Sequence, residues 1–223
     1  MISPGEFIPL LEETGLIVDV GVRVIEKACR CLHEWRARGL PAHFVLAVNV
    51  SARQLQDEHL LTETRRLMEA WNVPEGMLEL ELTESSLMEE PAYSRRLFAG
   101  LRGIGARIAI DDFGVRYSSL NYLREFAPDI LKIDKSFVDP IAENDRDRCL
   151  LEGIIQLSHT LGIGVIGEGV ETEAQRAILE NAGCDWIQGF LLARPMPLSG
   201  FENLMERMDM IRAEAGTVRT WPQ

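Results

Sequence analysis

Short apolar runs that favour β-strand alternate with longer segments of helical spacing along almost the whole chain, and this alternation limits the possible folds most. A strand followed repeatedly by a helix predicts a parallel sheet with helices outside it. The expected strands are 44–50, 77–84, 107–114, 130–138, 164–170 and 186–195. The expected helices are 4–15, 19–39, 54–70, 90–103, 144–161 and 172–182.

Six strand-helix units indicate an α/β fold that is too large for a small nucleotide-binding domain and two strands short of a closed eight-stranded barrel. The chain has no linker rich in Pro, Gly or Ser and no low-complexity tract. We therefore expect one domain over residues 1–210, followed by a C-terminal tail over 211–223.

The composition is that of an ordinary globular protein, with 46% hydrophobic and 26% charged residues among 223. The longest apolar stretches are far shorter than the roughly 20 residues of a membrane helix, and the start MISPGEF does not resemble a signal peptide. The four cysteines form no CxxC pair, which favours reduced thiols. We expect a cytoplasmic protein without a membrane segment.

The formal net charge of −12 argues against binding to DNA or RNA, because affinity for a phosphate backbone comes mainly from Lys and Arg. An anionic substrate would need another source of positive charge. Carboxylates that hold divalent cations would supply it.

Polar residues recur at the carboxyl end of every expected strand, where the strands of a parallel barrel form one rim. In chain order these residues are Asn49, Glu81 with Glu84, Asp111 with Asp112, Lys132, Glu168 and Gln188.

Taken singly, several of these residues have structural explanations. Asn49 could satisfy the backbone of a turn, and the Asp111-Asp112 pair could cap the following helix. Gln188 is uninformative by itself.

The remaining residues have alternatives of the same kind. Glu79 and Glu81 alternate with leucines, as in a half-exposed strand, and Lys132 and Glu168 could form a structural ion pair. All the rim positions together would require six unrelated coincidences, which favours a common functional site.

The charges of this rim indicate metal binding. Glu81, Asp111, Asp112 and Glu168 carry four negative charges against the single positive charge of Lys132. Each like-charge pair costs ~4 kcal/mol at ~4 Å and an effective dielectric constant of ~20. Oxygen ligands favour hard cations such as Mg²⁺ or Mn²⁺, and two such ions are the usual means of hydrolysing a phosphodiester.

Seven segments in order then resemble the EAL phosphodiesterases of bacterial signalling. They are ISPGEFIPLLEETGLI, AVNVSARQL, LELELTESSLM, IAIDDFG with YSSLNYL, DILKIDKSFV, GEGVETEAQ and GCDWIQGFLLARPMP, which span residues 2 to about 205. The resemblance implies a TIM-like βα barrel of the EAL type that opens cyclic di-GMP to linear pGpG with Mg²⁺ or Mn²⁺.

The resemblance also implies roles for individual residues. Asn49, Glu81 and Asp111 are similar to ligands of a first metal ion, and Asp111 also bridges to a second. Asp112 and Glu168 are similar to ligands of that second ion. A water molecule between the two ions would be the nucleophile.

Three more positions match the family's motifs. Lys132 would position and polarise the water, and Gln188 would hydrogen-bond in the same shell. Glu84 resembles the glutamate that supports the loop after Asp112.

Two departures from the family pattern bear on activity. Val115-Arg116 stands where small residues such as Thr-Gly usually follow DDFG. The Glu-Ala-Leu segment that names the family, with a further metal-ligating glutamate, and a nearby arginine are not in the sequence. We expect a barrel of about six strands with unpaired edges at 44–50 and 186–195, which invites insolubility or a homodimer. We expect hydrolysis by this chain to be absent or weak.

The sequence leaves two other classes of function open. A degenerate EAL domain could bind cyclic di-GMP or a protein partner without hydrolysis, as the missing glutamate would suggest. A barrel enzyme that abstracts a proton beside a carboxylate would share the acids and the lysine, but it does not explain the seven matching segments.

Overall fold

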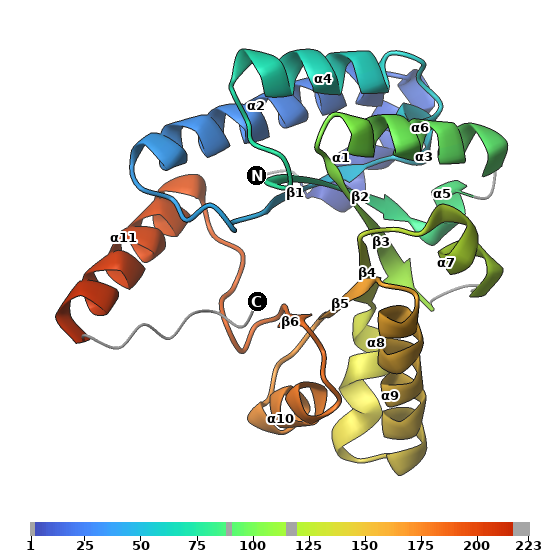
Figure 1. The fold of residues 1–223 in the computed structure, drawn as a ribbon, viewed down its shortest axis with the longest axis vertical. Helices are drawn as coiled ribbons and strands as arrows, with labels where there is room; N and C mark the ends of the chain where they lie inside the picture. Colours follow the sequence, from blue (N-terminus) through green and yellow to red (C-terminus); the bar gives the residue numbers. More distant parts are fainter. Residues whose placement is uncertain (1–2, 88–90, 115–119, 216–223) are drawn as a thin grey trace.

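One parallel sheet runs through the centre of the molecule in the order β1-β2-β3-β4-β5-β6 (Figure 1). The structure is a computed structural model, and it describes residues 3–87, 91–114 and 120–215. The strands are β1 (Leu46–Val50), β2 (Leu78–Thr83), β3 (Arg107–Phe113), β4 (Ile130–Ile133), β5 (Gly164–Gly167) and β6 (Trp186–Ile187).

Helices precede, connect and follow these strands. They are α1 (Pro4–Thr14), α2 (Ile17–Ala37), α3 (Ala52–Leu55), α4 (Leu60–Ala70), α5 (Glu84–Leu87), α6 (Pro91–Gly103), α7 (Leu120–Phe126), α8 (Lys135–Val138), the 3-10 helix η1 (Asp139–Ala142), α9 (Asp145–Thr160), α10 (Glu173–Asn181) and α11 (Leu198–Ala215). The strand-helix alternation and the six parallel strands confirm the expected α/β architecture.

Three expected strands are too long, and the one expected over 164–170 ends at Gly167. The strand expected over 130–138 ends at Ile133, because the Asp134 carboxylate accepts a hydrogen bond from the Ser136 amide and begins α8. The strand expected over 186–195 is reduced to β6, because the chain turns at Gly189, whose carbonyl accepts from Leu192 N at 3.1 Å. The expected helix 54–70 is two helices, α3 and α4.

Capping boxes fix where two of the connecting helices begin. Ser51 and Gln54 form one at α3, directly after β1, and Thr172 and Gln175 form another at α10, after β5. Each box lies just beyond the carboxyl end of a strand, so it also limits the path of the loop there.

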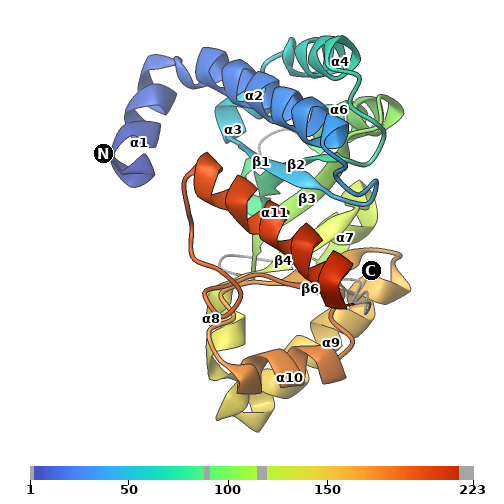
Figure 2. The same cartoon turned by 90° about the vertical axis from the view of Figure 1, so that its left-hand side faces the viewer.

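The sheet is open, as expected from six strands. Among the described strands, β1 pairs only with β2 and β6 only with β5. Figure 2 shows α11 crossing in front of the sheet on this open side, between α2 and α10. The expected edges at β1 and β6 are therefore confirmed.

Apolar side chains fill the space between the sheet and its helices in two clusters. The larger cluster packs β1 to β4 against α2, α4 and α6, with Leu32, Leu80 and Phe98 at its centre. The smaller packs β4 and β5 against α9 and α10 around Val165 and Ile155. These clusters hold the middle strands rigidly, which is what a site on the strand ends requires.

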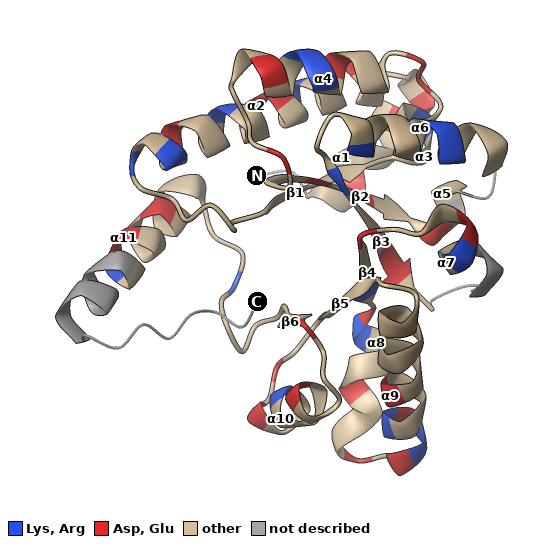
Figure 3. Ribbon diagram, in the orientation of Figure 1, with Lys and Arg blue, Asp and Glu red and all other residues tan. Residues whose placement is uncertain are grey.

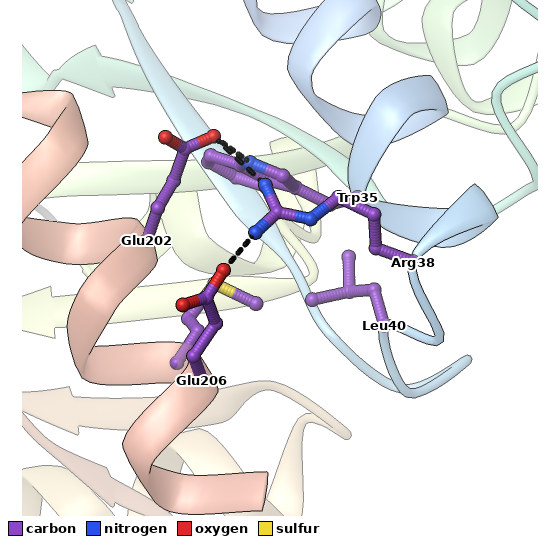
Figure 4. A pocket seen from close by; sticks show the side chains of 6 residues that line it. Trp35, Arg38, Leu40, Glu202 and Glu206 are labelled. Carbon is purple, nitrogen blue, oxygen red and sulfur yellow. Dashed lines mark hydrogen bonds and ion pairs between the residues drawn. The ribbon is translucent and has the colours of Figure 1, made fainter.

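The helix α11 docks on the carboxyl-terminal part of α2 (Figure 4). The Phe201 ring lies 5.4 Å from that of Trp35, and Trp35 Nε1 donates a hydrogen bond to Glu202 at 3.1 Å. Arg38 forms ion pairs with Glu202 and Glu206. Because α2 leads into β1, this contact lies at the amino-terminal end of the sheet, away from the rim.

The helix α11 continues across the domain boundary expected at residue 210 and ends at Ala215. The division into a domain over 1–210 and a tail over 211–223 stays a prediction. In the described parts of the chain, no helix combines the length and the apolar character needed to cross a bilayer.

Candidate active site: carboxylates around a buried lysine

Acidic residues on β2 and β3 lie within the sheet, whereas the outer helices α2 and α4 carry both signs of charge (Figure 3). Glu79 and Glu81 are buried, with 4% and 8% of their surface exposed. The half-exposed strand considered from the sequence is therefore wrong for β2. A buried carboxylate needs a partner, because desolvation disfavours its charge.

Lys132 is the common partner of three of the rim carboxylates. Its Nζ lies 2.8 Å from Glu81 Oε1, 3.1 Å from Asp111 Oδ1 and 2.8 Å from Glu168 Oε1. These residues come from β2, β3, β4 and the segment after β5, so four parts of the chain converge on one ammonium group. The structural ion pair of Lys132 and Glu168 exists, but it is one of three.

Lys132 keeps its proton at neutral pH. Burial by itself would lower the pKa of Lys132, but the charge of Glu81 and the hydrogen bonds to Glu168 and Glu81 raise it above its ordinary value. The ammonium group is therefore a fixed positive charge and a hydrogen-bond donor, and it cannot act as a base.

An irregularity in β3 brings two consecutive aspartates to the site. Neighbouring strand residues ordinarily point to opposite faces, but the register with β4 shifts between Ile110 and Phe113. Asp112 has a positive φ of 55°, and its amide donates to Asp111 Oδ1 at 3.1 Å. As a result, three carboxylate oxygens, one each from Asp111, Asp112 and Glu168, lie within 4.8 Å of one another.

These three residues fit a divalent cation. All their donors are carboxylate oxygens, which suit hard cations. Burial first, and then the charges of Asp111 and Asp134, raise the pKa of Asp112. Burial also raises the pKa of Glu168, although Lys132 opposes it. The carboxylates are thus held closer together than their charges favour, and a cation would relieve this repulsion.

The structure also gives positions for Asn49, Gln188 and Glu84. Asn49 is exposed on β1 and is the register partner of Glu81. Gln188 is exposed after β6, and its backbone bonds to Gly167 and Val170 on either side of the Glu168 segment. Glu84 is buried as the first residue of α5, not the last of a strand. The loop that it was expected to support, with Val115-Arg116, lies outside the described residues.

Sequence reasoning missed two neighbours of the site. Asp134, directly after β4, caps α8 and its charge contributes to the raised pKa of Asp112. Glu79 faces Arg107 on β3, with 3.4 Å between Oε2 and Nε. Burial raises the pKa of Glu79 to about 7, although Arg107 opposes this. The sequence feature that could have placed Glu79 near the site is its position two residues before Glu81, on the same face of β2.

Comparison with known proteins gives one consistent result. The EAL domain family model matches residues 1–195. The signaling protein YkoW of Bacillus subtilis is 41% identical over 202 residues, which are 91% of this chain and 25% of YkoW. The bifunctional diguanylate cyclase/cyclic di-GMP phosphodiesterase MucR of Pseudomonas aeruginosa is 41% identical over 88% of this chain and 29% of its own length. The chain thus spans about a quarter of the length of these curated relatives.

Solved structures agree with the observed fold. The structure described as the PaMucR phosphodiesterase, c-di-GMP complex, is 40% identical, with a TM-score of 0.84 over 90% of this chain and 81% of that one. The EAL domain of Mycobacterium smegmatis DcpA is 35% identical, with a TM-score of 0.81 over 86% of each chain.

Proposed function

The chain belongs to the EAL domain family, and from that premise we propose that it hydrolyses cyclic di-GMP to linear pGpG in a reaction that requires Mg²⁺ or Mn²⁺. The TIM-like barrel fold of the family agrees with the parallel sheet of six strands. The observation that carries the proposal is the set of Glu81, Asp111 and Glu168 around Lys132, with Asp112 beside them.

Asp111, Asp112 and Glu168 would hold one cation, and Glu81 with Asn49 would hold another together with Asp111. When bound, the cations supply positive charge that stabilises the phosphate in the transition state and favours ionisation of the attacking water. The proposal rests on the oxygen donors of these residues and on their common position at the strand ends.

Lys132 would hold the attacking water by donating a hydrogen bond from Nζ in place of one of its three carboxylate contacts. A lysine ammonium group donates hydrogen bonds and accepts none, which suits this role. Gln188 would hydrogen-bond at the exposed side of the rim, where its backbone follows the Glu168 segment. Glu84 would support the loop after Asp112 from its buried position in α5.

The named relatives support the choice of substrate. MucR and the phosphodiesterase PdeR of Escherichia coli, 37% identical over 93% of this chain and 31% of its own, are both named cyclic di-GMP phosphodiesterases. An FimX EAL domain from Pseudomonas aeruginosa bound to c-di-GMP is 27% identical, with a TM-score of 0.80. The cytoplasmic location and the homodimer expected from the sequence stay predictions.

Incubation of the purified protein with cyclic di-GMP and Mn²⁺ tests the proposal. We expect at most slow formation of pGpG, with Mn²⁺ or Mg²⁺ and not with EDTA, and we expect Lys135→Met to behave like the wild type because that lysine pairs outside the carboxylate cluster. Nucleotide that is bound but not cleaved would instead favour a binding domain. Nucleotide that is neither bound nor cleaved would overturn the proposal.

A further inference from the structure

A second set of interior side chains lies one level below the rim. Glu79 on β2, Ile130 on β4 and Trp186 on β6 each precede a predicted site residue by two positions. Side chains two residues apart on a strand point to the same face, so Glu79, Ile130 and Trp186 stand beneath Glu81, Lys132 and Gln188.

Arg107 joins the two sides of this lower level. It is the register partner of Glu79, and the two side chains form an ion pair with a 3.4 Å separation. The guanidinium carbon of Arg107 also lies 5.8 Å from the centre of the Trp186 ring, within the range of a cation–π contact. A single arginine therefore connects β2 and β3 to β6.

Gly164 on β5 makes this contact possible. A Cβ atom at Gly164 would lie 2.8 Å from the Trp186 ring and 2.9 Å from Ile130 Cδ1. The φ of Gly164 is not positive, so the glycine is needed for space rather than for backbone freedom. Because Gly164 has no side chain, the indole can lie against β5 and face Arg107 on β3.

The strand β6 is short and lies at the edge of the sheet. It is two residues long, and it pairs only with β5 among the described strands. Its two side chains are half-buried, whereas Glu79 beneath Glu81 is almost fully buried. Backbone hydrogen bonds from Gln188 N to Gly167 and from Val170 N to Gln188 hold the chain just after β6, and a contact that fixes Trp186 adds a side-chain restraint two residues earlier.

We infer that Arg107, paired with Glu79 and in cation–π contact with Trp186, is a positioning residue that anchors β6 and thereby helps to hold Gln188 at the rim. The effect of Arg107 on hydrolysis rests on the proposed function, whereas its effect on the position of β6 does not. Arg107 touches neither the rim carboxylates nor Lys132 in any contact that the structure describes. Its partner Glu79 does interact electrostatically with Glu81 and Lys132, so hydrogen exchange of β6 is the readout specific to anchoring.

Arg107→Met tests the inference, because it keeps the aliphatic length but removes the cation that faces the indole. Hydrogen exchange of the backbone amides in 186–191 should become at least about tenfold faster, and kcat should fall about tenfold with KM changed less than about twofold. Arg107→Lys keeps the charge facing Glu79 but not the planar guanidinium, so we expect it to restore only part of both quantities. Gly164→Val should reproduce the faster exchange by displacing the indole.

The matched control is Arg102→Met. Arg102 pairs with Asp129 at 3.3 Å and has 33% of its side chain exposed, close to the 26% of Arg107, but it has no contact with Trp186. Arg102→Met should leave kcat and the hydrogen exchange of the backbone amides in 186–191 unchanged. If wild-type hydrolysis is absent, the proposed function fails and exchange alone decides the anchoring. Unchanged exchange in Arg107→Met, or faster exchange with an unaltered kcat in an active enzyme, would overturn the inference.

Discussion

Lys132 is the residue on which the electrostatics of the rim depends most, because three carboxylates share its ammonium group. Its removal would leave those carboxylates buried without a balancing charge. We expect Lys132→Met, measured by urea unfolding without divalent metal, to lower the free energy of unfolding by about 3–5 kcal/mol. Mn²⁺ should recover part of this loss, because a cation can replace the ammonium group as the partner of the carboxylates.

Lys135→Met is the control for this prediction. Lys135 also pairs with two acidic residues, but 44% of its side chain is exposed, so its loss should change the free energy of unfolding by less than about 1 kcal/mol. Equal values for the two variants would show that burial of Lys132 does not set the strength of its ion pairs.

The order in which cations bind is a second prediction at this scale. We expect Mn²⁺ to bind among Asp111, Asp112 and Glu168 before it binds beside Asn49 and Glu81. The first group offers three carboxylates, whereas the second offers one amide, the carboxylate of Glu81 and a share of Asp111, so it has fewer negative charges. Anomalous diffraction from crystals soaked in Mn²⁺ checks this, and occupancy only beside Asn49 would refute it.

At the scale of single elements, the irregularity in β3 makes the metal group possible, and Asp112 is its strained residue. Asn tolerates the positive φ of 55° at this position, whereas a β-branched residue does not. We expect Asp112→Asn to leave the free energy of unfolding nearly unchanged while it weakens Mn²⁺ binding about tenfold or more.

Asp112→Val should weaken Mn²⁺ binding and also lower the free energy of unfolding by about 1–3 kcal/mol. Calorimetric titration and urea unfolding of the two variants separate loss of charge from backbone strain. If the two variants had equal free energies of unfolding, a β-branched residue would be tolerated at position 112 as well as Asn, and the positive φ there would not cause strain.

The existence and order of the strands could be predicted from the sequence because each apolar run must be buried in the sheet. Their ends could not, because the apolar character of 130–138 continues past Ile133 into a helix that Asp134 begins. The convergence of Glu81, Asp111, Lys132 and Glu168 followed from the common rim of parallel strands. The ion pair of Glu79 and Arg107 was missed because ELEL also has the pattern of a half-exposed strand.

At the scale of the whole molecule, α11 covers the open side of the sheet through contacts that no local pattern predicts. Residues 201 and 202 meet Trp35, far away in the sequence. We expect Phe201→Ala to lower the free energy of docking of α11 by about 2 kcal/mol, less than for a fully buried ring because Phe201 is only half-buried. Hydrogen exchange in 201–208 should then become faster.

Arg38→Ala, which removes exposed ion pairs to the same helix, should change this exchange much less. An equal or larger effect of Arg38→Ala would show that charge, and not the aromatic contact, holds α11 in place.

The central claim, that the rim activates water against a phosphodiester, is tested most directly by hydrolysis in ¹⁸O-labelled water. Protein in molar excess over cyclic di-GMP, with Mn²⁺, makes a single turnover sufficient. We predict pGpG whose terminal phosphate carries one ¹⁸O atom, with formation that Lys132→Met and Asp112→Asn both abolish. Product without the label, or a rate that neither substitution lowers, would contradict the claim.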